Sequence, residues 1–342
     1  MKNSEKSLWS VVPPARSRRI EIAFQALCAA VCVFALVGPA RSDETNWSQS
    51  ISIGTAAPGG SYHAYGAQLA KILTRELGLS FGEQLTEGPI QNVQLIESGA
   101  AQIGFVTMGA ALQGWNGTES WTKGQQFRSL RVLFPMYDTP FTFAVLKGSP
   151  VRSLSDLNGK RIGAGPSEGT AGFYIPKFLK TLGIDADITF GTYAELAAQL
   201  EKGQIDVLAA AAGAPFPALA GLDAKKLLRF IDISKSQIVA LRLAMPELAP
   251  SVVPAGVYPS LMKDYASVGL FNFAVARSDM PNSLAYRIVE AVFKNRDELV
   301  SAHAAASETI PANFSRNTFM PYHPGANRYF SKVMTQGTVQ GD

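Results

Sequence analysis

One structural pattern occurs twice along this chain, and it limits the possible folds more than any other feature. A strand candidate leads into a glycine-rich turn and then into an amphipathic helix, over residues 51–77 and again over residues 160–182. Each copy continues with a shorter helix and a further strand candidate, at 102–107 in the first copy and 204–208 in the second. Strands that alternate with helices predict parallel sheets made of βαβ units. Two such sets predict two α/β lobes, each a mainly parallel sheet flanked by helices.

Two apolar stretches lie outside this pattern and are suited to connect the lobes. The first covers residues 130–137 with 141–146, and the second covers 269–276. We expect the first to cross from lobe I to lobe II and the second to cross back, so that a long helix over 283–302 rejoins lobe I. Two crossings form a hinge, and a hinge between two lobes encloses a cleft. The predicted organisation is lobe I over 43–140, lobe II over 141–269, and a return to lobe I with C-terminal helices over 270–342.

The first 42 residues are typical of an export signal. Basic residues up to Arg19 precede an apolar run over 22–38, and small residues at 38–42 offer cleavage sites. The mature chain would then begin near Asp43, in the periplasm. The apolar run of 17 residues also reaches the lower limit of about 17 for a membrane-spanning helix, so an uncleaved anchor is the alternative.

The basic excess of the chain lies in that same segment. The formal net charge is +4, and residues 1–42 hold six Lys and Arg residues against two Glu residues, so the remainder is neutral overall. A neutral body gives no support to binding of a phosphate backbone, so nucleic acid is not predicted as a partner. Both cysteines, Cys28 and Cys32, also precede residue 43. The body therefore has no disulfide, no thiol chemistry and no thiolate metal site.

The two glycine-rich turns are the candidate ligand contacts. The first backbone N–H groups of a helix have no internal partner and, with the helix dipole, favour an anion. Gly59 and Gly60 permit close backbone approach in the first turn, where Ser61 either caps the helix or donates its hydroxyl; Gly169 and Thr170 do the same in the second turn. Such a turn is often only a helix cap. Two of them at corresponding positions of two lobes favour a binding role, because ligands of open α/β sheets lie at the carboxyl ends of the strands.

Motifs for catalysis or for a cofactor are not found. The glycine-rich run over 163–169 is one residue too long for a dinucleotide fingerprint, and neither a phosphate-binding loop nor a nucleophile elbow is present. The three histidines, His63, His303 and His323, are not at metal-ligand spacing. We therefore expect no catalytic residue, no metal and no cofactor, and a binding protein in place of an enzyme.

Several segments of the chain resemble one family. They are residues 51–55 with Gly60, Ser61, Tyr62, His63 and Gly66; Asn92 with Leu95 and the strand 99–107; 154–163 with 167–170; 213–218; 253–259; and 323–326 with Tyr329. Together they resemble the TAXI solute receptors of tripartite ATP-independent periplasmic (TRAP) transporters, over nearly the whole chain after the export signal. The most specific elements are the Pro-Ala-Gly-Val-Tyr-Pro run over 254–259 and the ending.

The resemblance implies a two-lobed, type II-like periplasmic binding protein. Such a receptor closes on a small organic acid or amino acid, such as glutamate, 2-oxoglutarate or another dicarboxylate, and delivers it to the membrane subunits of a TRAP transporter. Where the family often has glycines, this chain has Ala56 and Ala57, and where the family has a polar residue it has Phe216, which implies a less polar or bulkier ligand. The ligand positions implied by the resemblance, together with the turns, are Gly59, Gly60, Ser61, Tyr62, Asn92, Thr107, Ser167, Gly169, Thr170, Ala214 and Pro215.

Two other functions remain open from the sequence. A binding protein that serves a sensor kinase would have the same sequence features. A periplasmic enzyme on the same scaffold would need a nucleophile or an acid/base pair in the cleft, and Glu168 is the only acid placed at a turn.

Overall fold

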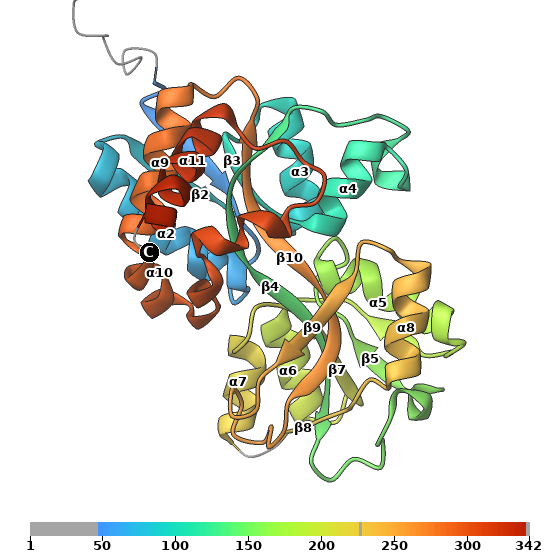
Figure 1. Ribbon diagram of the computed structural model, residues 1–342. Helices are drawn as coiled ribbons and strands as arrows, with labels where there is room; N and C mark the ends of the chain where they lie inside the picture. The colour runs from blue at the N-terminus through green and yellow to red at the C-terminus, as the bar shows by residue number, and fades with distance from the viewer. Residues whose placement is uncertain (1–46, 226–227, 340–342) are drawn as a thin grey trace, which may run out of the picture. The chain divides into compact units, whose positions relative to one another are not determined.

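The computed structural model describes residues 47–225 and 228–339 (Figure 1). The predicted export signal over residues 1–42 lies outside these ranges. Within them, no helix combines the length and the apolar character that crossing a bilayer requires.

The first lobe begins with the predicted alternation of strands and helices. Strand β1 lies between β2 and β3 and is parallel to both. Helix α2 forms because its apolar residues recur at helical spacing and are buried, among them Tyr65, Leu69 and Leu73, and it ends where Gly78 takes a left-handed conformation with φ of 70°. The elements are β1 (Ser50–Gly54), α2 (Ser61–Leu77), β2 (Ser80–Gln84), α3 (Pro89–Ser98), β3 (Ile103–Thr107) and α4 (Met108–Asn116).

Two long antiparallel strands, β4 (Leu130–Leu146) and β10 (Tyr265–Arg277), belong to both lobes. Strand β10 pairs with β3 through residues 272–276 and with β9 (Ala249–Val253) through residues 265–269. The end of β4 over 141–146 pairs with strands of the second lobe. Figure 1 shows β4 and β10 running together between the two sets of helices. The two predicted crossings are therefore confirmed, and the 130–137 and 141–146 stretches form one continuous strand.

The second lobe repeats the arrangement of the first. Strand β5 lies between β6 and β7 and is parallel to both, and the continuous sheet has the order β2-β1-β3-β10-β4-β7-β5-β6, with β8 on β4 and β9 on β10. The elements are β5 (Arg161–Gly163), α5 (Thr170–Leu182), β6 (Asp187–Thr189), α6 (Tyr193–Glu201), β7 (Val207–Ala211), α7 (Pro217–Ala224), β8 (Leu228–Phe230) and α8 (Lys235–Ala244). The predicted α/β fold of two lobes is confirmed.

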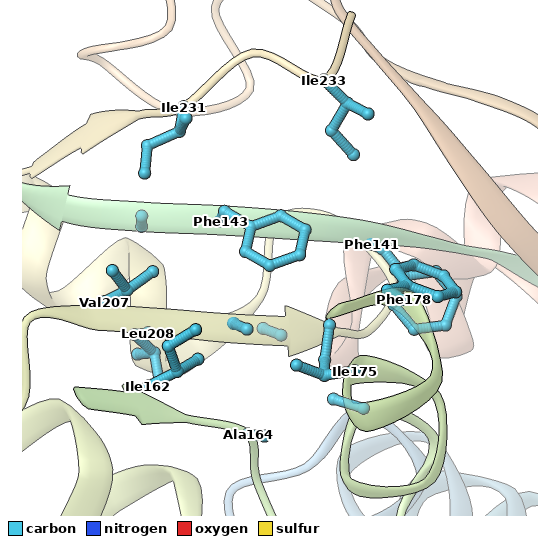
Figure 2. Packing of buried hydrophobic residues seen from close by; sticks show 14 of the residues in the cluster. Phe141, Phe143, Ile162, Ala164, Ile175, Phe178, Val207, Leu208, Ile231 and Ile233 are labelled. Atoms are coloured by element: carbon cyan, nitrogen blue, oxygen red, sulfur yellow. The ribbon is translucent and has the colours of Figure 1, made fainter. Parts of the chain in front are cut away.

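Each lobe has its own apolar core. Figure 2 shows part of the core of the second lobe, where side chains of β4, β5 and β7 pack against α5. The rings of Phe141 and Phe178 have centroids 4.6 Å apart. In the first lobe, α2 and α9 (Asn282–Lys294) pack on the sheet together with α11 (Pro324–Val339).

The predicted single helix over 283–302 is wrong, because two helices cover this stretch. Helix α9 ends at Lys294, Asn295 follows it as the cap residue, and α10 (Arg296–Ala302) begins at the next residue. Asn295 leaves the helical conformation, and its Nδ2 donates to the carbonyl of Ala291 at 2.8 Å. An asparagine side chain that bonds to nearby backbone competes with the helix, which explains the break. Short 3₁₀ helices complete the chain at Ser120–Thr122, Leu154–Leu157, Ala304–Glu308 and Pro311–Arg316.

Candidate functional site

A cavity lies between the two lobes at the glycine-rich turns. Its empty volume is about 610 Å³, counted out to the solvent at its mouth. Five helices, α2, α3, α5, α6 and α7, begin at this cavity, since the residue before each helix or its first residue lines the wall. The turns that follow β1 and β5 are the ones in which the sequence predicted ligand contacts, and both turns contribute to the wall.

Four of these helix starts leave their N–H groups without a side-chain cap. The residues at the cap positions are Gly60, Gly88, Gly169 and Phe216, and none accepts a hydrogen bond from its helix through its side chain. Thr192 is the exception, because its Oγ1 accepts from the N–H of Glu195 at 3.3 Å and so caps α6. Uncapped N–H groups at a cavity, each at the positive end of a helix dipole, favour an anionic group.

Two buried hydroxyl groups at the cavity have no partner. Ser61 Oγ and Tyr137 Oη make no hydrogen bond of acceptable geometry to any described residue, although their residues are only 6% and 0% exposed. Burial raises the pKa of Tyr137 well above its ordinary value, so the phenol stays protonated and can donate. A buried hydroxyl without a partner costs about 1–3 kcal/mol. A ligand oxygen in the cavity would recover this cost.

The pairing of β4 with β10 is irregular next to Tyr137 at the cavity wall. Phe271 pairs with Asp138 and Phe273 pairs with Pro135, so Asn272 on β10 faces two residues of β4, Met136 and Tyr137. This arrangement is a β-bulge, which bends a strand and redirects its side chains. Pro135 lacks an N–H for the ladder, which is consistent with the irregularity at this point.

A hydrogen-bond network of buried side chains forms the floor of the cavity. Tyr62 Oη donates to Asn272 Oδ1 at 2.6 Å, and Asn272 Nδ2 donates to the Tyr137 carbonyl and to Thr139 Oγ1, each at 2.6 Å. The network connects α2 with β10 and β4, where the two strands pass from one lobe to the other. Buried networks whose members are paired hold their side chains in one arrangement. The floor is therefore ordered before any ligand arrives.

The match with a known family extends over most of the described chain. The model of the NMT1-like family matches residues 53–332, which include every element that borders the cavity. The chain belongs to the NMT1-like family.

Solved structures with a similar fold cover more than four fifths of this NMT1-like chain. MatC (Rpa3494) from Rhodopseudomonas palustris with bound malate is 11% identical, with a TM-score of 0.54 over 83% of this chain and 97% of that chain. CAE31940 from Bordetella bronchiseptica RB50 is 15% identical, with a TM-score of 0.49 over 84% of this chain and 98% of that chain. A structure described as a periplasmic transporter is 15% identical, with a TM-score of 0.48 over 84% of this chain and 93% of that chain. At these identities the likeness to MatC shows the fold alone.

The structure brings five of the sequence-predicted positions of this NMT1-like chain to the cavity wall. They are Gly60, Ser61, Tyr62, Gly169 and Thr170. Four predicted positions do not line the cavity: Gly59, Ser167, Ala214 and Pro215. Phe216, which follows Pro215 in the chain, does line it. Gly59 instead supplies a left-handed conformation with φ of 86° in the first turn.

Asn92 and Thr107 have internal partners and do not line the cavity. Asn92 is fully buried, and its Nδ2 donates to the carbonyls of Thr55 and Phe105 at 2.8 Å each. Its Oδ1 accepts from Thr86 Oγ1 at 2.9 Å. The side chain of Thr107 caps α4 by accepting from the N–H of Ala110 at 3.2 Å. These two residues connect the elements beneath the cavity.

Sequence reasoning missed the polar residues Tyr137, Thr139 and Asn272 of the wall, among others. Tyr137 and Asn272 lie in stretches that the sequence assigned only to crossing strands, and Thr139 lies between two such stretches. One signal was available, because Asn272 is the single amide in the apolar run over 269–276. A buried amide in a strand needs partners, and here the partners are the groups of the cavity floor.

The lobes also contact each other beside the cavity. Tyr174 of α5 accepts from Gln113 Nε2 of α4 at 3.0 Å and donates to Glu247 Oε1 at 2.9 Å. Lys177 Nζ lies 2.7 Å from Glu119 Oε1. These contacts join α4 of the first lobe to α5 of the second.

Proposed function

We propose that the chain is a solute-binding receptor that holds a small organic anion between its lobes. The observation that carries the proposal is the pair of buried, unpartnered hydroxyls, Ser61 Oγ and Tyr137 Oη, at a cavity where α2 and α5 begin without a side-chain cap. Hydroxyl and backbone N–H groups are donors, and a carboxylate supplies acceptors only. The anion is therefore held by hydrogen bonds from the protein and by the two helix dipoles.

We further propose a receptor without catalysis. No Cys, His or Lys is found among the described residues of the cavity wall, and Glu87, its one carboxylate, is exposed. A nucleophile with an adjacent base needs two such groups within hydrogen-bond reach. The wall offers donors that orient an anion, which is the chemistry of capture.

The partner that we propose is the membrane part of a TRAP transporter, with the chain as its TAXI receptor in the periplasm. Support comes from the segments that resemble this family and from the export signal predicted over residues 1–42. The two-lobed fold suits this role, because lobes joined by two crossing strands close on a solute and open to release it. The malate in MatC supports a small organic acid as the class of solute.

The proposal is tested by thermal shift and calorimetry of the purified protein against organic acids, amino acids, sugars and metal ions. We expect stabilisation by acids, and loss of most of the affinity in Ser61→Ala and in Tyr137→Phe. Ser98→Ala and Tyr322→Phe are matched controls, since Ser98 is exposed and donates to Leu95, and Tyr322 donates to Phe314. Stabilisation by sugars or metal ions, with none by acids, would contradict the proposal.

A further inference from the structure

The cavity wall carries almost no charge. Among the described residues that line it there is no Lys, Arg or His, and Glu87 at the exposed rim is the one carboxylate. A carboxylate that leaves water needs hydrogen-bond donors or a cation to offset its desolvation. The donors that bear on a ligand include the unpartnered hydroxyls of Ser61 and Tyr137 and the uncapped first turns of α2, α3, α5 and α7.

The opposite wall, formed by the starts of α6 and α7 and the end of β7, has several of its polar groups paired within the protein. Three hydrogen bonds pair groups here: Thr192 Oγ1 to Glu195 Oε2 at 2.8 Å, the Ala211 N–H to Tyr193 Oη at 3.4 Å, and the Phe216 N–H to Tyr258 Oη at 2.7 Å. Burial raises the pKa of Tyr193 to about 12, so this phenol is neutral and keeps its own O–H as a donor. That hydroxyl and the uncapped start of α7 are what this wall offers a charged ligand group, and none of its described residues is a cation.

What the opposite wall presents to the cavity is apolar. The rings of Tyr193 and Phe216 meet edge to face with centroids 4.7 Å apart, and Ala211 and Ala212 lie beside them. Phe216 is only 1% exposed. A hydrocarbon group placed here gains about 25 cal/mol for each Å² of apolar surface that leaves water. A carboxylate placed here would have the Tyr193 hydroxyl and the start of α7 as its donors and no cation among the described residues of the wall.

We propose that the ligand is a monocarboxylate with an apolar aliphatic or aromatic body, and that a second carboxylate is disfavoured. This inference rests on the proposed function and narrows it, and it departs from the dicarboxylates that the family resemblance implies. A second carboxylate would meet either the opposite wall, whose surface is mostly rings and alanines with no cation among its described residues, or Glu87, which repels it at the rim. The malate in MatC supports only the broad class of organic acids, because at 11% identity the comparison does not extend to the residues that line this cavity.

The test compares acids of equal chain length that differ in the number of carboxylates. Calorimetry of the purified protein at one ionic strength uses hexanoate against adipate, with 3-phenylpropanoate as the aromatic acid and 2-oxoglutarate as the dicarboxylate of the resembled family. We expect hexanoate to bind about tenfold more tightly than adipate, or better, because adipate must desolvate its second charge against a mostly apolar wall that has no cation. We expect 3-phenylpropanoate to bind at least as tightly as hexanoate.

Two variants at Phe216 test the apolar wall itself. Leu and Asn have similar shapes and differ in polarity, so Phe216→Asn is expected to weaken hexanoate binding several-fold more than Phe216→Leu. Equal losses in the two variants, or adipate binding as tightly as hexanoate in the unmodified protein, would overturn the monocarboxylate inference and leave an organic-acid receptor in place. If neither kind of acid binds, the proposed function fails as well.

Discussion

Gly88 of the first lobe and Gly169 of the second lie in contact at the cavity. A Cβ atom at Gly88 would lie 3.3 Å from the Cα of Gly169, and Gly88 has a φ of 136°, which L side chains rarely adopt. The close approach of the lobes at this point therefore depends on the absence of a side chain.

We expect Gly88→Ala to keep the lobes apart and to weaken ligand binding about tenfold or more, because the added methyl meets the opposite backbone in the closed form. Gly124→Ala is the control, since Gly124 also has a positive φ of 76° but has no neighbour within 4 Å. Both variants should lose about 1–3 kcal/mol of unfolding free energy from backbone strain. Calorimetry and small-angle scattering check the result; equal affinities in the two variants would contradict a role in closure.

Tyr174 connects the lobes beside the cavity, and we expect Tyr174→Phe to weaken that connection. The variant removes the hydrogen bonds to Gln113 and Glu247 and leaves a half-buried carboxylate with one donor fewer. We expect a loss of about 1–3 kcal/mol in the free energy of unfolding and a faster release of ligand. Urea unfolding and stopped-flow displacement measure these effects. An unchanged rate of release would show that this contact does not hold the lobes closed.

A substitution at Asn92 tests whether this residue has a structural role or a ligand-binding role. Asn92→Ala removes three buried hydrogen bonds beneath the cavity, and we expect it to lower the free energy of unfolding by about 2–4 kcal/mol. At a temperature where the variant stays folded, its ligand affinity should remain within a few-fold of the unmodified protein. A loss of affinity as large as that of Ser61→Ala would place Asn92 in the binding site after all.

We expect the buried side chain of His303 to lower the free energy of unfolding in mild acid. Burial lowers the pKa of His303 from 6.5 to about 4, and its Nε2 has no partner among the described residues. Between these two pH values the unfolded chain binds a proton that the folded protein does not, so stability falls as the pH is lowered from 6.5 toward 4. The contribution of this one group is on the order of 3 kcal/mol.

The measurement is chemical denaturation across this pH range. We expect His303→Phe, which keeps a ring against Tyr137, to flatten the pH dependence relative to the unmodified protein. His63→Gln is the control, because His63 is partly exposed and pairs with Glu83. A pH dependence that is the same in His303→Phe and in the unmodified protein would refute the assignment.

The fold followed from local patterns in the sequence, because alternation and helical spacing are properties of neighbouring residues. The break at Asn295 was missed because the stretch over 283–302 contains no Gly or Pro, and only the bond from Asn295 to Ala291 shows where α9 ends. The turns at Ser61 and Thr170 were found by the same local patterns that indicate a helix start.

The remainder of the site depends on contacts between distant parts of the chain. Tyr62 and Asn272 are 210 residues apart in sequence, so their hydrogen bond has no local signature. The family resemblance implied Asn92 and Thr107 as ligand contacts, and only their partners show that they connect elements of the protein. Sequence patterns therefore located the cavity but not its floor.

The place where the floor lies has a mechanical consequence. Asn272 and Thr139 are part of the two strands that join the lobes, at the point where any opening motion must bend the sheet. In the proposed receptor the solute would rest on the two strands that join the lobes, so a substitution that changes recognition here would also change how easily these strands bend. Selectivity and the rate of ligand release would then be coupled.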